Sequence, residues 1–451
     1  MALTGIQILK MLPKKNCGEC QIPTCLAFAM KVASGQAEIG ECPYVSDEVK
    51  ASIGEASAPP IRTVTIGSGD NAFKIGGETC LYRHEKRFEN PTGIAVLVTT
   101  AMADADVDGR VERFKSLRYE RVGVMMKADL IAVKDSDGDK AKFVALVQKV
   151  LEGAPDANII LMSEDAATMS EAAKLCGDRN PLLFGATDAN VADMIGVAKD
   201  SGCPLGCKGS NIDNLIEVSE KAVEEGLKDV IIDTGARTLR DAFEDNIVAR
   251  RASIKTKYKP LGFPTITFPC EMTDDPMMEA MIASVVMAKY AGIIVLSDLQ
   301  GDLLFPLLLE QLNIFTDPQR PMVVQEDVYS INGPDENSPV LVTCNFSLTY
   351  FIVSGEIEGS NVPSWLLIKD TEGLSVLTAW AAGKFGADLI AQFMKKAGVE
   401  EKVKHRELII PGYLASMKGE LEEELPGWTI TIGPREAGHL PAFLKEWKPA
   451  A

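Results

Sequence analysis

Short apolar runs alternate with longer amphipathic stretches through the middle of the chain. The runs are apolar on both faces, which is typical of strands in a parallel sheet covered by helices. Eight such runs, separated by helix-like segments such as 141–151 and 276–289, predict a (β/α)8 TIM barrel. The predicted strands are Ile94–Val98, Leu130–Val133, Asn158–Met162, Pro181–Phe184, Pro204–Cys207, Val230–Asp233, Thr265–Phe268 and Ile293–Leu296.

A hairpin is predicted before the barrel, where the strand-like segments 61–66 and 73–75 flank Gly67-Ser-Gly-Asp70. After residues 317–321 a further alternation of strands and helices predicts an open, doubly wound, Rossmann-like α/β domain. Its predicted strands are Val340–Asn345, Trp365–Lys369, Glu407–Pro411 and Thr429–Gly433, and its predicted helices are Leu348–Glu358, Leu374–Lys396, Tyr413–Glu424 and Ala442–Trp447.

In such a sheet, ligands bind outside the carboxyl ends of the strands. The loops expected there are 343–349, 370–376, 412–414 and 433–438. At the other end of the chain, the small-residue and proline stretch Ala51–Pro60 is typical of a linker. The predicted fold class is therefore α/β, with a small N-terminal domain (1–57), a central TIM barrel (58–320) and a C-terminal doubly wound domain (321–451).

Composition narrows the range of partners. The 451 residues include 46 Lys and Arg against 64 Asp and Glu, a net charge of −18, which disfavours nucleic acid and anionic membranes as partners. Apolar runs such as Leu303–Leu309 are much shorter than the roughly 20 residues that span a bilayer. The first residues do not resemble a secretory signal. A cytoplasmic protein with reduced thiols is expected, so its ten cysteines predict metal ligands or buried apolar groups rather than disulfides.

Four cysteines near the N-terminus form the sharpest motif, Cys17-x2-Cys20-x4-Cys25 followed by Cys42. Four thiolates in a short segment can hold a zinc ion or an iron–sulfur cluster. A single close pair and a proline directly after Cys42 favour a [4Fe–4S] cluster, with a zinc site and unligated cysteines as the alternatives. Cys25 also begins a predicted helix over 24–34, whose dipole stabilises a thiolate.

The other candidate residues carry weaker signals. Cys203 and Cys207 flank a predicted strand, where buried core thiols are expected, and a structural role is expected for Cys80, Cys176, Cys270 and Cys344. Asp188, Asn190 and Asp233 follow predicted barrel strands, the usual place for catalytic groups. Helix capping and loop hydrogen bonds are the alternative explanation for all three.

Four segments of the chain together resemble a known protein family. The chain resembles the large (gamma) subunit of the corrinoid iron–sulfur protein of the acetyl-CoA synthase/CO dehydrogenase system. The resemblance covers essentially the whole chain. The segments that carry it are Asn16–Ala29, Ser338–Tyr350, Asp370–Trp380 and Ile432–Ala437. Gln21 departs slightly from the pattern, because glycine is expected after Cys20.

The resemblance implies a methyl carrier of the anaerobic acetyl-CoA pathway. In that family a cobamide, as Co(I), takes a methyl group from methyl-tetrahydrofolate with the help of a separate methyltransferase and passes it to acetyl-CoA synthase. A [4Fe–4S] cluster, here on Cys17, Cys20, Cys25 and Cys42, returns Co(II) to Co(I). The implied partners are a small (delta) subunit in a heterodimer, the methyltransferase, acetyl-CoA synthase/CO dehydrogenase and a low-potential electron donor. Such a carrier is an enzyme only in a loose sense, since its partners catalyse both transfers.

The histidines bear on how cobalt would be held. None of His84, His405 and His439 stands in the Asp-x-His-x-x-Gly motif of many corrinoid proteins. A corrinoid bound base-off and without a protein histidine is therefore expected, which makes Co(II) easier to reduce. The residues expected to contact it are Thr343, Thr349, Gly373, Leu374, Ser375, Val376 and Ala437, with Arg435 as a weaker candidate for a cofactor phosphate.

Two other functions remain open from the residues alone. One is a self-sufficient barrel methyltransferase that binds its own pterin. The other is an iron–sulfur electron-transfer protein without a corrinoid. Pterin binding by the isolated chain would favour the first, and absence of cobalt would favour the second.

Overall fold

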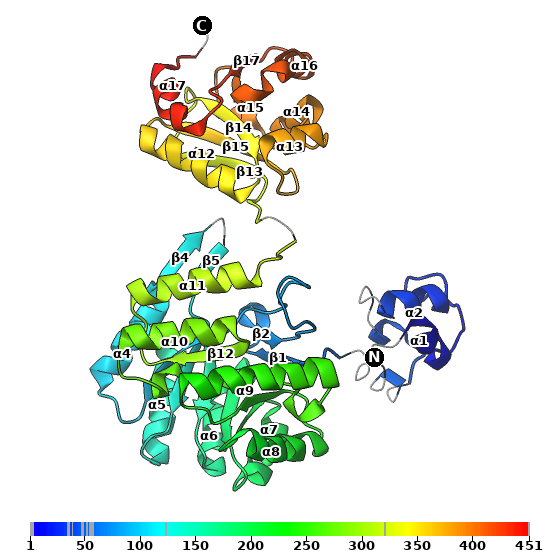
Figure 1. Cartoon of the computed structure of the whole chain (residues 1–451), viewed down its shortest axis with the longest axis vertical. Coiled ribbons are helices and arrows are strands. Elements are labelled where there is room, and N and C mark those ends of the chain that lie inside the picture. The colour runs from blue at the N-terminus through cyan, green and yellow to red at the C-terminus, as the bar shows by residue number, and fades with distance from the viewer. Residues whose placement is uncertain are drawn as a thin grey trace. The chain divides into compact units, whose positions relative to one another are not determined.

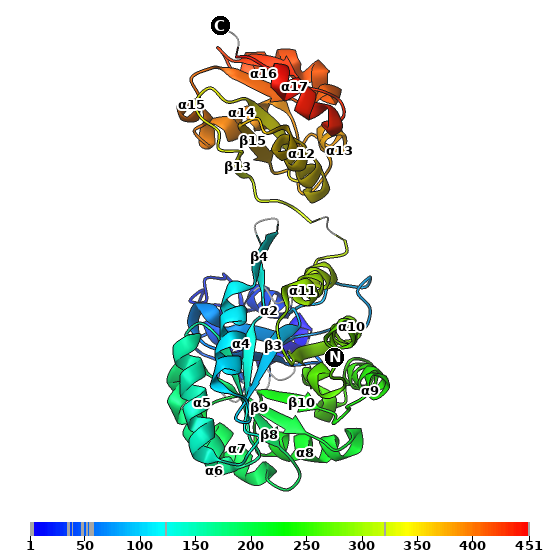
Figure 2. The same cartoon turned by 90° about the vertical axis from the view of Figure 1, so that its left-hand side faces the viewer.

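The computed structural model describes residues 4–33, 37, 39–46, 49–50, 53, 58–121, 124–319 and 322–449 (Figures 1 and 2). Most of the predicted linker Ala51–Pro60 lies outside these residues, as do Ser34 at the predicted helix end and Arg320 and Pro321 at the predicted second boundary. The chain divides into two compact units, which are Met1–Leu117 with Lys127–Phe315, and Arg118–Met126 with Thr316–Ala451.

The eight predicted apolar runs are the strands of a closed parallel barrel, so the predicted TIM barrel is confirmed. Around the barrel the order is β10-β11-β12-β3-β6-β7-β8-β9. The short fifth strand, β9, belongs to the core, because its first three residues are buried. The strands are β3 (Gly93–Thr99), β6 (Leu130–Lys134), β7 (Asn158–Met162), β8 (Leu182–Ala186), β9 (Leu205–Lys208), β10 (Val230–Asp233), β11 (Thr265–Thr267) and β12 (Ala291–Leu296).

Helices cover the outside of the barrel (Figure 2). Several of them begin after a side chain that accepts hydrogen bonds from the first turn, which satisfies N–H groups that have no partner within the helix. These capping residues are Asp139, Asp165, Asn211, Thr238 and Asp275. The helices are α4 (Asp104–Ser116), α5 (Lys140–Gly153), α6 (Ala166–Cys176), α7 (Val191–Ser201), α8 (Ile212–Glu224), α9 (Leu239–Arg251), α10 (Pro276–Ala288) and α11 (Gly301–Phe315).

The predicted hairpin closes the amino-terminal end of the barrel. Its antiparallel strands are β1 (Thr63–Ile66) and β2 (Phe73–Gly76). Their apolar side chains belong to the same buried cluster as the barrel interior. Asn180, which precedes β8, donates from Nδ2 to the carbonyl of Thr65 at 2.9 Å, so the hairpin is fixed at the amino ends of the strands.

A second hairpin, β4 (Arg118–Arg121) and β5 (Val124–Lys127), was not predicted. Its first strand, Arg-Tyr-Glu-Arg, lacks an apolar face, so the residues carry no strand signal there. Residues 118–126 belong to the C-terminal unit, where the Arg121 guanidinium lies 4.8 Å from the ring centre of Phe351.

The C-terminal unit is an open sheet of order β13-β15-β14-β16-β17. All strands are parallel except the edge strand β13, which is antiparallel to β15 and was not predicted. Separate apolar clusters cover the two faces, one with α12 and α17 and the other with α14 and α16, as expected for a doubly wound fold. The strands are β13 (Asp327–Ile331), β14 (Val340–Cys344), β15 (Ser364–Lys369), β16 (Glu407–Ile410) and β17 (Thr429–Ile432).

Two predicted helices of this unit were wrong in detail. The single helix predicted over 374–396 is two helices, because Gly383 adopts φ +69° between them and turns the chain. The helix predicted over 413–424 begins as a 3-10 turn that precedes α16. The helices are α12 (Ser347–Ser360), α13 (Val376–Ala381), α14 (Ala387–Lys396), α15 (Val399–Lys402), α16 (Lys418–Glu424) and α17 (Leu440–Glu446).

The N-terminal segment has a small apolar core of its own. Helices α1 (Gly5–Met11) and α2 (Cys25–Ala33) pack together, with Ile8 and Phe28 almost fully buried. Thr4 starts α1 with a capping box, in which its side chain and that of Gln7 each bond to the other's backbone.

Candidate functional site

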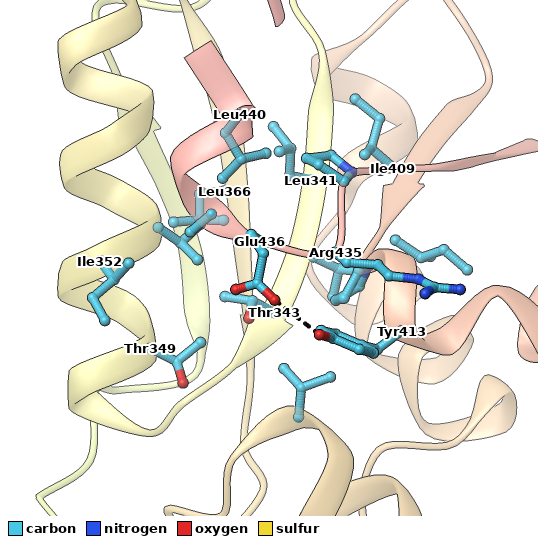
Figure 3. A pocket seen from close by; sticks show the side chains of 18 of the residues that line it. Leu341, Thr343, Thr349, Ile352, Leu366, Ile409, Tyr413, Arg435, Glu436 and Leu440 are labelled. Atoms are coloured by element: carbon cyan, nitrogen blue, oxygen red, sulfur yellow. Dashed lines mark hydrogen bonds between the residues drawn. The ribbon is translucent and has the colours of Figure 1, made fainter. Parts of the chain in front are cut away.

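A cavity of about 440 Å³ opens at the carboxyl ends of β14 and β16 in the C-terminal unit (Figure 3). Its walls come from these strands, from α12 and from the loops that follow β16 and β17. The volume is within the range of small-molecule and cofactor sites.

The sheet order explains why the cavity lies there. From β14 the chain crosses through α12 to β15 on one side, whereas from β16 it crosses through α16 to β17 on the other. The two connections diverge, and the gap between β14 and β16 is the switch point at which doubly wound sheets bind ligands. Thr343, near the end of β14, and Ile410, at the end of β16, both line the cavity.

Five of the seven predicted corrinoid-contact residues line the cavity, and they come from three separate parts of the chain. These residues are Thr343, Thr349, Ser375, Val376 and Ala437. Gly373 and Leu374 are not among the lining residues. Gly373 instead forms a turn at φ +76°, and its N–H donates to the buried Asn345 Oδ1 at 3.0 Å.

The cavity also contains a polar contact that was not predicted from the sequence. The Tyr413 hydroxyl donates to Glu436 Oε1 at 2.8 Å, and this bond raises the pKa of the phenol (Figure 3). Arg435 lies over the Tyr413 ring, 5.7 Å from its centre. Arg435, the weaker candidate from the sequence, thus lines the cavity together with Glu436. Their contacts with Tyr413 could not be predicted, because these residues meet only when the loops after β16 and β17 are brought together.

A glycine allows those two loops to meet. A Cβ at Gly412 would lie 2.5 Å from the carbonyl oxygen of Gly433 and 2.8 Å from the backbone N of Arg435. The Gly412 N–H donates to the carbonyl of Pro434 at 3.1 Å, and Gly433 N–H donates to that of Ile410 at 2.9 Å. The loops therefore touch backbone to backbone, and a side chain would separate them.

None of the three histidines is among the residues that line the cavity. His405 Nε2 lies 2.8 Å from the carbonyl of Ser338, which precedes β14 and so lies at the opposite end of the sheet. His84 stacks on Tyr82 in the other unit. His439 stands between two lining residues, but it is exposed.

The cysteines of the N-terminal motif surround the small core there. Cys42 is buried in the core, Cys20 and Cys25 pack against it, and Cys17 is exposed. Tyr44 connects the two ends of the cysteine motif, because its hydroxyl donates to Glu19 at 2.6 Å. This bond and the charge of Glu19 raise the pKa of the phenol, and Cys17 and Cys42 raise it further by smaller amounts. Lys15 Nζ lies 3.6 Å from the centre of the same ring.

Asn16 makes two bonds to Cys25. Its Oδ1 accepts from the Cys25 N–H at 2.8 Å, and its own N–H donates to Cys25 Sγ at 3.3 Å. Cys25 is the first residue of α2, as predicted, so this pair fixes the thiol at the helix start. Asn16, Gly18 and Gln21 all have positive φ, which lets the loop between the cysteines turn tightly.

The donor set fits an iron–sulfur cluster. Its four sulfur groups, an apolar core beside them and a backbone N–H directed at one sulfur are the features by which proteins hold and tune such clusters. The fit is one of donor chemistry and not of position: among the described residues, which include all four cysteines, no three His, Cys, Asp or Glu side chains are brought together so as to hold a metal ion.

The remaining cysteines have the character of core residues. Cys203 and Cys207 are buried, as predicted, and so are Cys80, Cys176 and Cys344, whereas Cys270 is partly buried. Burial raises the pKa of the thiols of Cys176, Cys207 and Cys270 to about 12, so they stay protonated at neutral pH.

At the carboxyl end of the barrel, ionic groups pair with one another. Glu271 accepts from Lys134 Nζ at 2.7 Å and from Arg237 Nε at 2.5 Å. Arg237 also bonds to the buried Asp233 at 2.8 Å. Asn190 has loop partners too, since its Oδ1 accepts from the Thr187 N–H at 2.7 Å. Internal bonding thus accounts for Asp233 and Asn190, and Asp188 is exposed.

Comparison with known proteins identifies the family. A family model described as CO dehydrogenase/acetyl-CoA synthase delta subunit matches residues 63–444, and one described as putative Fe-S cluster matches residues 12–44. The corrinoid/iron-sulfur protein large subunit of Moorella thermoacetica is 44% identical over 445 residues, 99% of each chain. The chain belongs to this large-subunit family. The resemblance predicted from the sequence is confirmed.

Archaeal relatives extend the large-subunit family. The gamma subunit of the acetyl-CoA decarbonylase/synthase complex of Methanopyrus kandleri is 34% identical and covers 98% of each chain. Gamma subunit 2 of Methanosarcina thermophila is also 34% identical over 98% of each chain. Among solved structures, dihydropteroate synthase of Thermus thermophilus is similar to 56% of this chain and 100% of its own, with a TM-score of 0.39 and 14% identity.

Both candidate sites of this large-subunit family member lie within the matched segments. Cys17, Cys20, Cys25 and Cys42 fall in residues 12–44, and the whole cavity falls in residues 63–444. In the described part of the chain, no helix is both long enough and apolar enough to cross a membrane.

Proposed function

We propose that the chain is a cytoplasmic methyl-group carrier of an anaerobic acetyl-CoA pathway. In this proposal residues 1–57 hold a [4Fe–4S] cluster, residues 58–320 form the barrel and residues 321–451 hold a corrinoid. When bound, a cobamide supplies a cobalt ion that as Co(I) takes a methyl group from methyl-tetrahydrofolate and yields it to acetyl-CoA synthase, while a [4Fe–4S] cluster supplies the electron that restores Co(I) from Co(II).

The observation that carries the proposal is the cavity at the switch point of the C-terminal sheet. A protein 44% identical over 99% of the chain is called a corrinoid/iron-sulfur protein, which supports a corrinoid site in this chain. The cavity between β14 and β16 has a volume of about 440 Å³, is mostly apolar in its lining residues and has hydroxyl groups at its edge, so it can take part of a corrinoid. Those features suit a macrocycle that carries amide side chains.

The lining side chains have distinct tasks in this proposal. The Thr343, Thr349 and Ser375 hydroxyls can donate to or accept from corrinoid amides and the nucleotide tail. Ile352 and Leu440 exclude water from one wall. Gly373 and Leu374 act indirectly, by shaping the loop that presents Ser375.

Filling the cavity tests where the corrinoid binds. Gly438 lines the cavity, and a Cβ there would meet no atom within 4 Å, so the side chain of Gly438→Phe starts in open space beside the cavity. We expect cobalt content to fall at least tenfold while iron content is unchanged. Gly419→Phe is the matched control, because a Cβ at Gly419 on α16 is equally free but lies outside the lining. Normal cobalt content in Gly438→Phe would exclude this site.

The corrinoid is proposed to be bound base-off and without a protein imidazole. His439 tests this point most sharply, since its neighbours Gly438 and Leu440 both line the cavity. We expect His439→Ala to keep its full cobalt content and an unchanged Co(II) electron paramagnetic resonance spectrum. Loss of nitrogen splitting in that variant would show instead that His439 is a ligand.

Metal analysis tests the division between the two cofactors. Chain purified without oxygen together with its small subunit should contain about four irons and one cobalt per heterodimer. Replacing Cys17 or Cys20 with serine should lower iron and leave cobalt unchanged. One zinc ion in place of iron would contradict the cluster.

The two other functions are less well supported. A pterin-binding barrel needs polar groups at the carboxyl ends of its strands that can bind the ligand, yet Lys134 and Arg237 there are each paired with Glu271. An electron carrier without a corrinoid leaves the cavity of the C-terminal unit without a ligand. The proposed partners are accordingly a small (delta) subunit, a methyl-tetrahydrofolate methyltransferase, acetyl-CoA synthase/CO dehydrogenase and a low-potential electron donor.

A further inference from the structure

Glu436 is the one carboxylate among the residues that line the cavity in the described part of the chain. Arg435, which precedes it, is the one lining cation. The other lining residues are uncharged, and most of them are apolar. Glu436 is exposed to solvent, so its carboxylate brings a negative charge to the cavity wall at a place that a ligand can reach.

Arg435 does not neutralise this charge. Its guanidinium lies over the Tyr413 ring, 5.7 Å from the ring centre, and Figure 3 shows it extended away from the Glu436 carboxylate. Within the described part of the chain, the Glu436 side chain takes part in no ion pair, and its one hydrogen bond is the 2.8 Å bond that Oε1 accepts from the Tyr413 hydroxyl. The second carboxylate oxygen, Oε2, therefore has its full capacity to accept a bond from a ligand.

Tyr413 holds the carboxylate in place from a different loop. Glu436 follows β17, whereas Tyr413 follows β16, and the two loops touch backbone to backbone at Gly412. An exposed glutamate loses side-chain freedom when it binds a ligand, which costs affinity. The bond from Tyr413 restricts Glu436 before a ligand arrives, so less freedom is left to lose.

We infer that Glu436 is a specificity residue, which accepts a hydrogen bond from a peripheral amide of the corrinoid and rejects a corrinoid with a free acid at that position. This inference rests on the proposed function. An ionised carboxylate accepts hydrogen bonds but cannot donate one. A neutral amide therefore forms a charge-assisted bond with it, whereas a second carboxylate offers no donor and is repelled.

The test compares a cobamide with its monocarboxylic acids, in each of which one peripheral amide has been hydrolysed. The full chain with its small subunit, freed of corrinoid, is dialysed to equilibrium against each ligand at pH 8, where the acids are ionised, and bound cobalt is measured. We expect the parent chain to bind one of the acids at least tenfold more weakly than the cobamide. Glu436→Gln should reduce this ratio to less than threefold, because a glutamine amide can also donate to a carboxylate.

Glu420→Gln is the matched control, since Glu420 is exposed on α16 outside the cavity lining, and it should keep the tenfold ratio. Melting temperature identifies a variant that has not folded. If Glu436→Gln fails to fold, Glu436→Ala decides, because it also removes the charge and should also lose the discrimination.

The ratio of the two affinities separates recognition from a merely structural role. A glutamate that only supported Tyr413 would change both affinities alike, so a tenfold ratio that persisted in Glu436→Gln would overturn the inference. Equal binding of the cobamide and all its acids by the parent chain would overturn it as well, while leaving the proposed function intact. Failure of the parent chain to bind the cobamide at all would instead refute the proposed function, and this inference with it.

Discussion

In the loop between Cys17 and Cys25, one residue other than glycine has a left-handed backbone conformation. Gln21 is at φ +62°, in the left-handed region that costs most residues about 1 kcal/mol or more. Gly18, three residues earlier, has φ +74° without that cost. The glycine expected at position 21 from the family pattern would suit this conformation, so the loop carries strain at one residue.

Relieving the strain should strengthen the N-terminal domain. We expect Gln21→Gly to raise its free energy of unfolding by about 0.5–1 kcal/mol, because glycine adopts positive φ freely. Gly18→Ala should have the opposite effect, since alanine would be strained there. Urea titration of the full chain, followed by loss of cluster absorbance without oxygen, measures both. Equal midpoints for the two variants would contradict this account.

Asn16 is a second residue whose role depends on a single contact. We expect Asn16→Ala to retain less iron, because the Cys25 N–H loses its 2.8 Å acceptor and alanine tolerates φ +48° less well. Asn16→Asp keeps an acceptor and a residue type common in the left-handed region, so it should retain iron nearly as well as the parent. Iron per chain after a fixed exposure to a chelator is the measurement.

At the scale of elements, the loops after β16 and β17 build one wall of the cavity by touching at Gly412. We expect Gly412→Ala to reduce cobalt content severalfold, because its Cβ would force the loops apart and separate Tyr413 from Glu436. Gly419→Ala is the control, with open space around its Cβ. A Gly412→Ala protein with full cobalt would mean that this wall is not needed for binding.

How much could be predicted from sequence differs between kinds of element. The barrel strands were predicted well, because strands buried on both faces are apolar throughout and end at polar residues. The edge strand β13 and the hairpin strand β4 were not predicted, because strands with half-exposed or charged positions do not form a continuous apolar run. The helix break at Gly383 was not predicted, because a glycine inside a helical pattern does not by itself show whether the helix ends.

The same reasoning applies to the candidate site. Thr343 and Ser375 could be predicted to lie near a ligand, because they are located where parallel strands end or helices begin. The pair of Tyr413 and Glu436 could not, because their contact joins residues from two loops whose closeness depends on packing. Long-range contacts of this kind carry no local signal in one sequence.

At the scale of the whole molecule, one aspartate should make stability depend on pH. Asp129 precedes β6, and its carboxylate accepts from the Ile94 N–H of β3 at 3.0 Å. Burial raises the pKa of this carboxyl from 3.8 to about 7. The folded chain therefore holds a proton that the unfolded chain releases, so stability falls as the pH rises from about 4 to about 7.

Removing the charge should remove that slope. Asp129→Asn is expected to be more stabilising at pH 8 than at pH 5, by up to about 1.4 kcal/mol for each unit of pKa shift spanned. Asp156→Asn, at an exposed turn before β7, is the control. Urea unfolding of the barrel, followed by circular dichroism at both pH values, gives the comparison. Parallel curves for the two variants would show that Asp129 ionises normally.

The paired charges at the carboxyl end of the barrel limit which ligands and substitutions that end can accept. Glu271 is paired with both Lys134 and Arg237. An anionic ligand that bound to these two cations would therefore have to displace the Glu271 carboxylate. Neutralising one partner of this group would leave the others with an uncompensated charge, so substitutions of Lys134, Arg237 or Glu271 are expected to be tolerated best in pairs that keep the net charge unchanged.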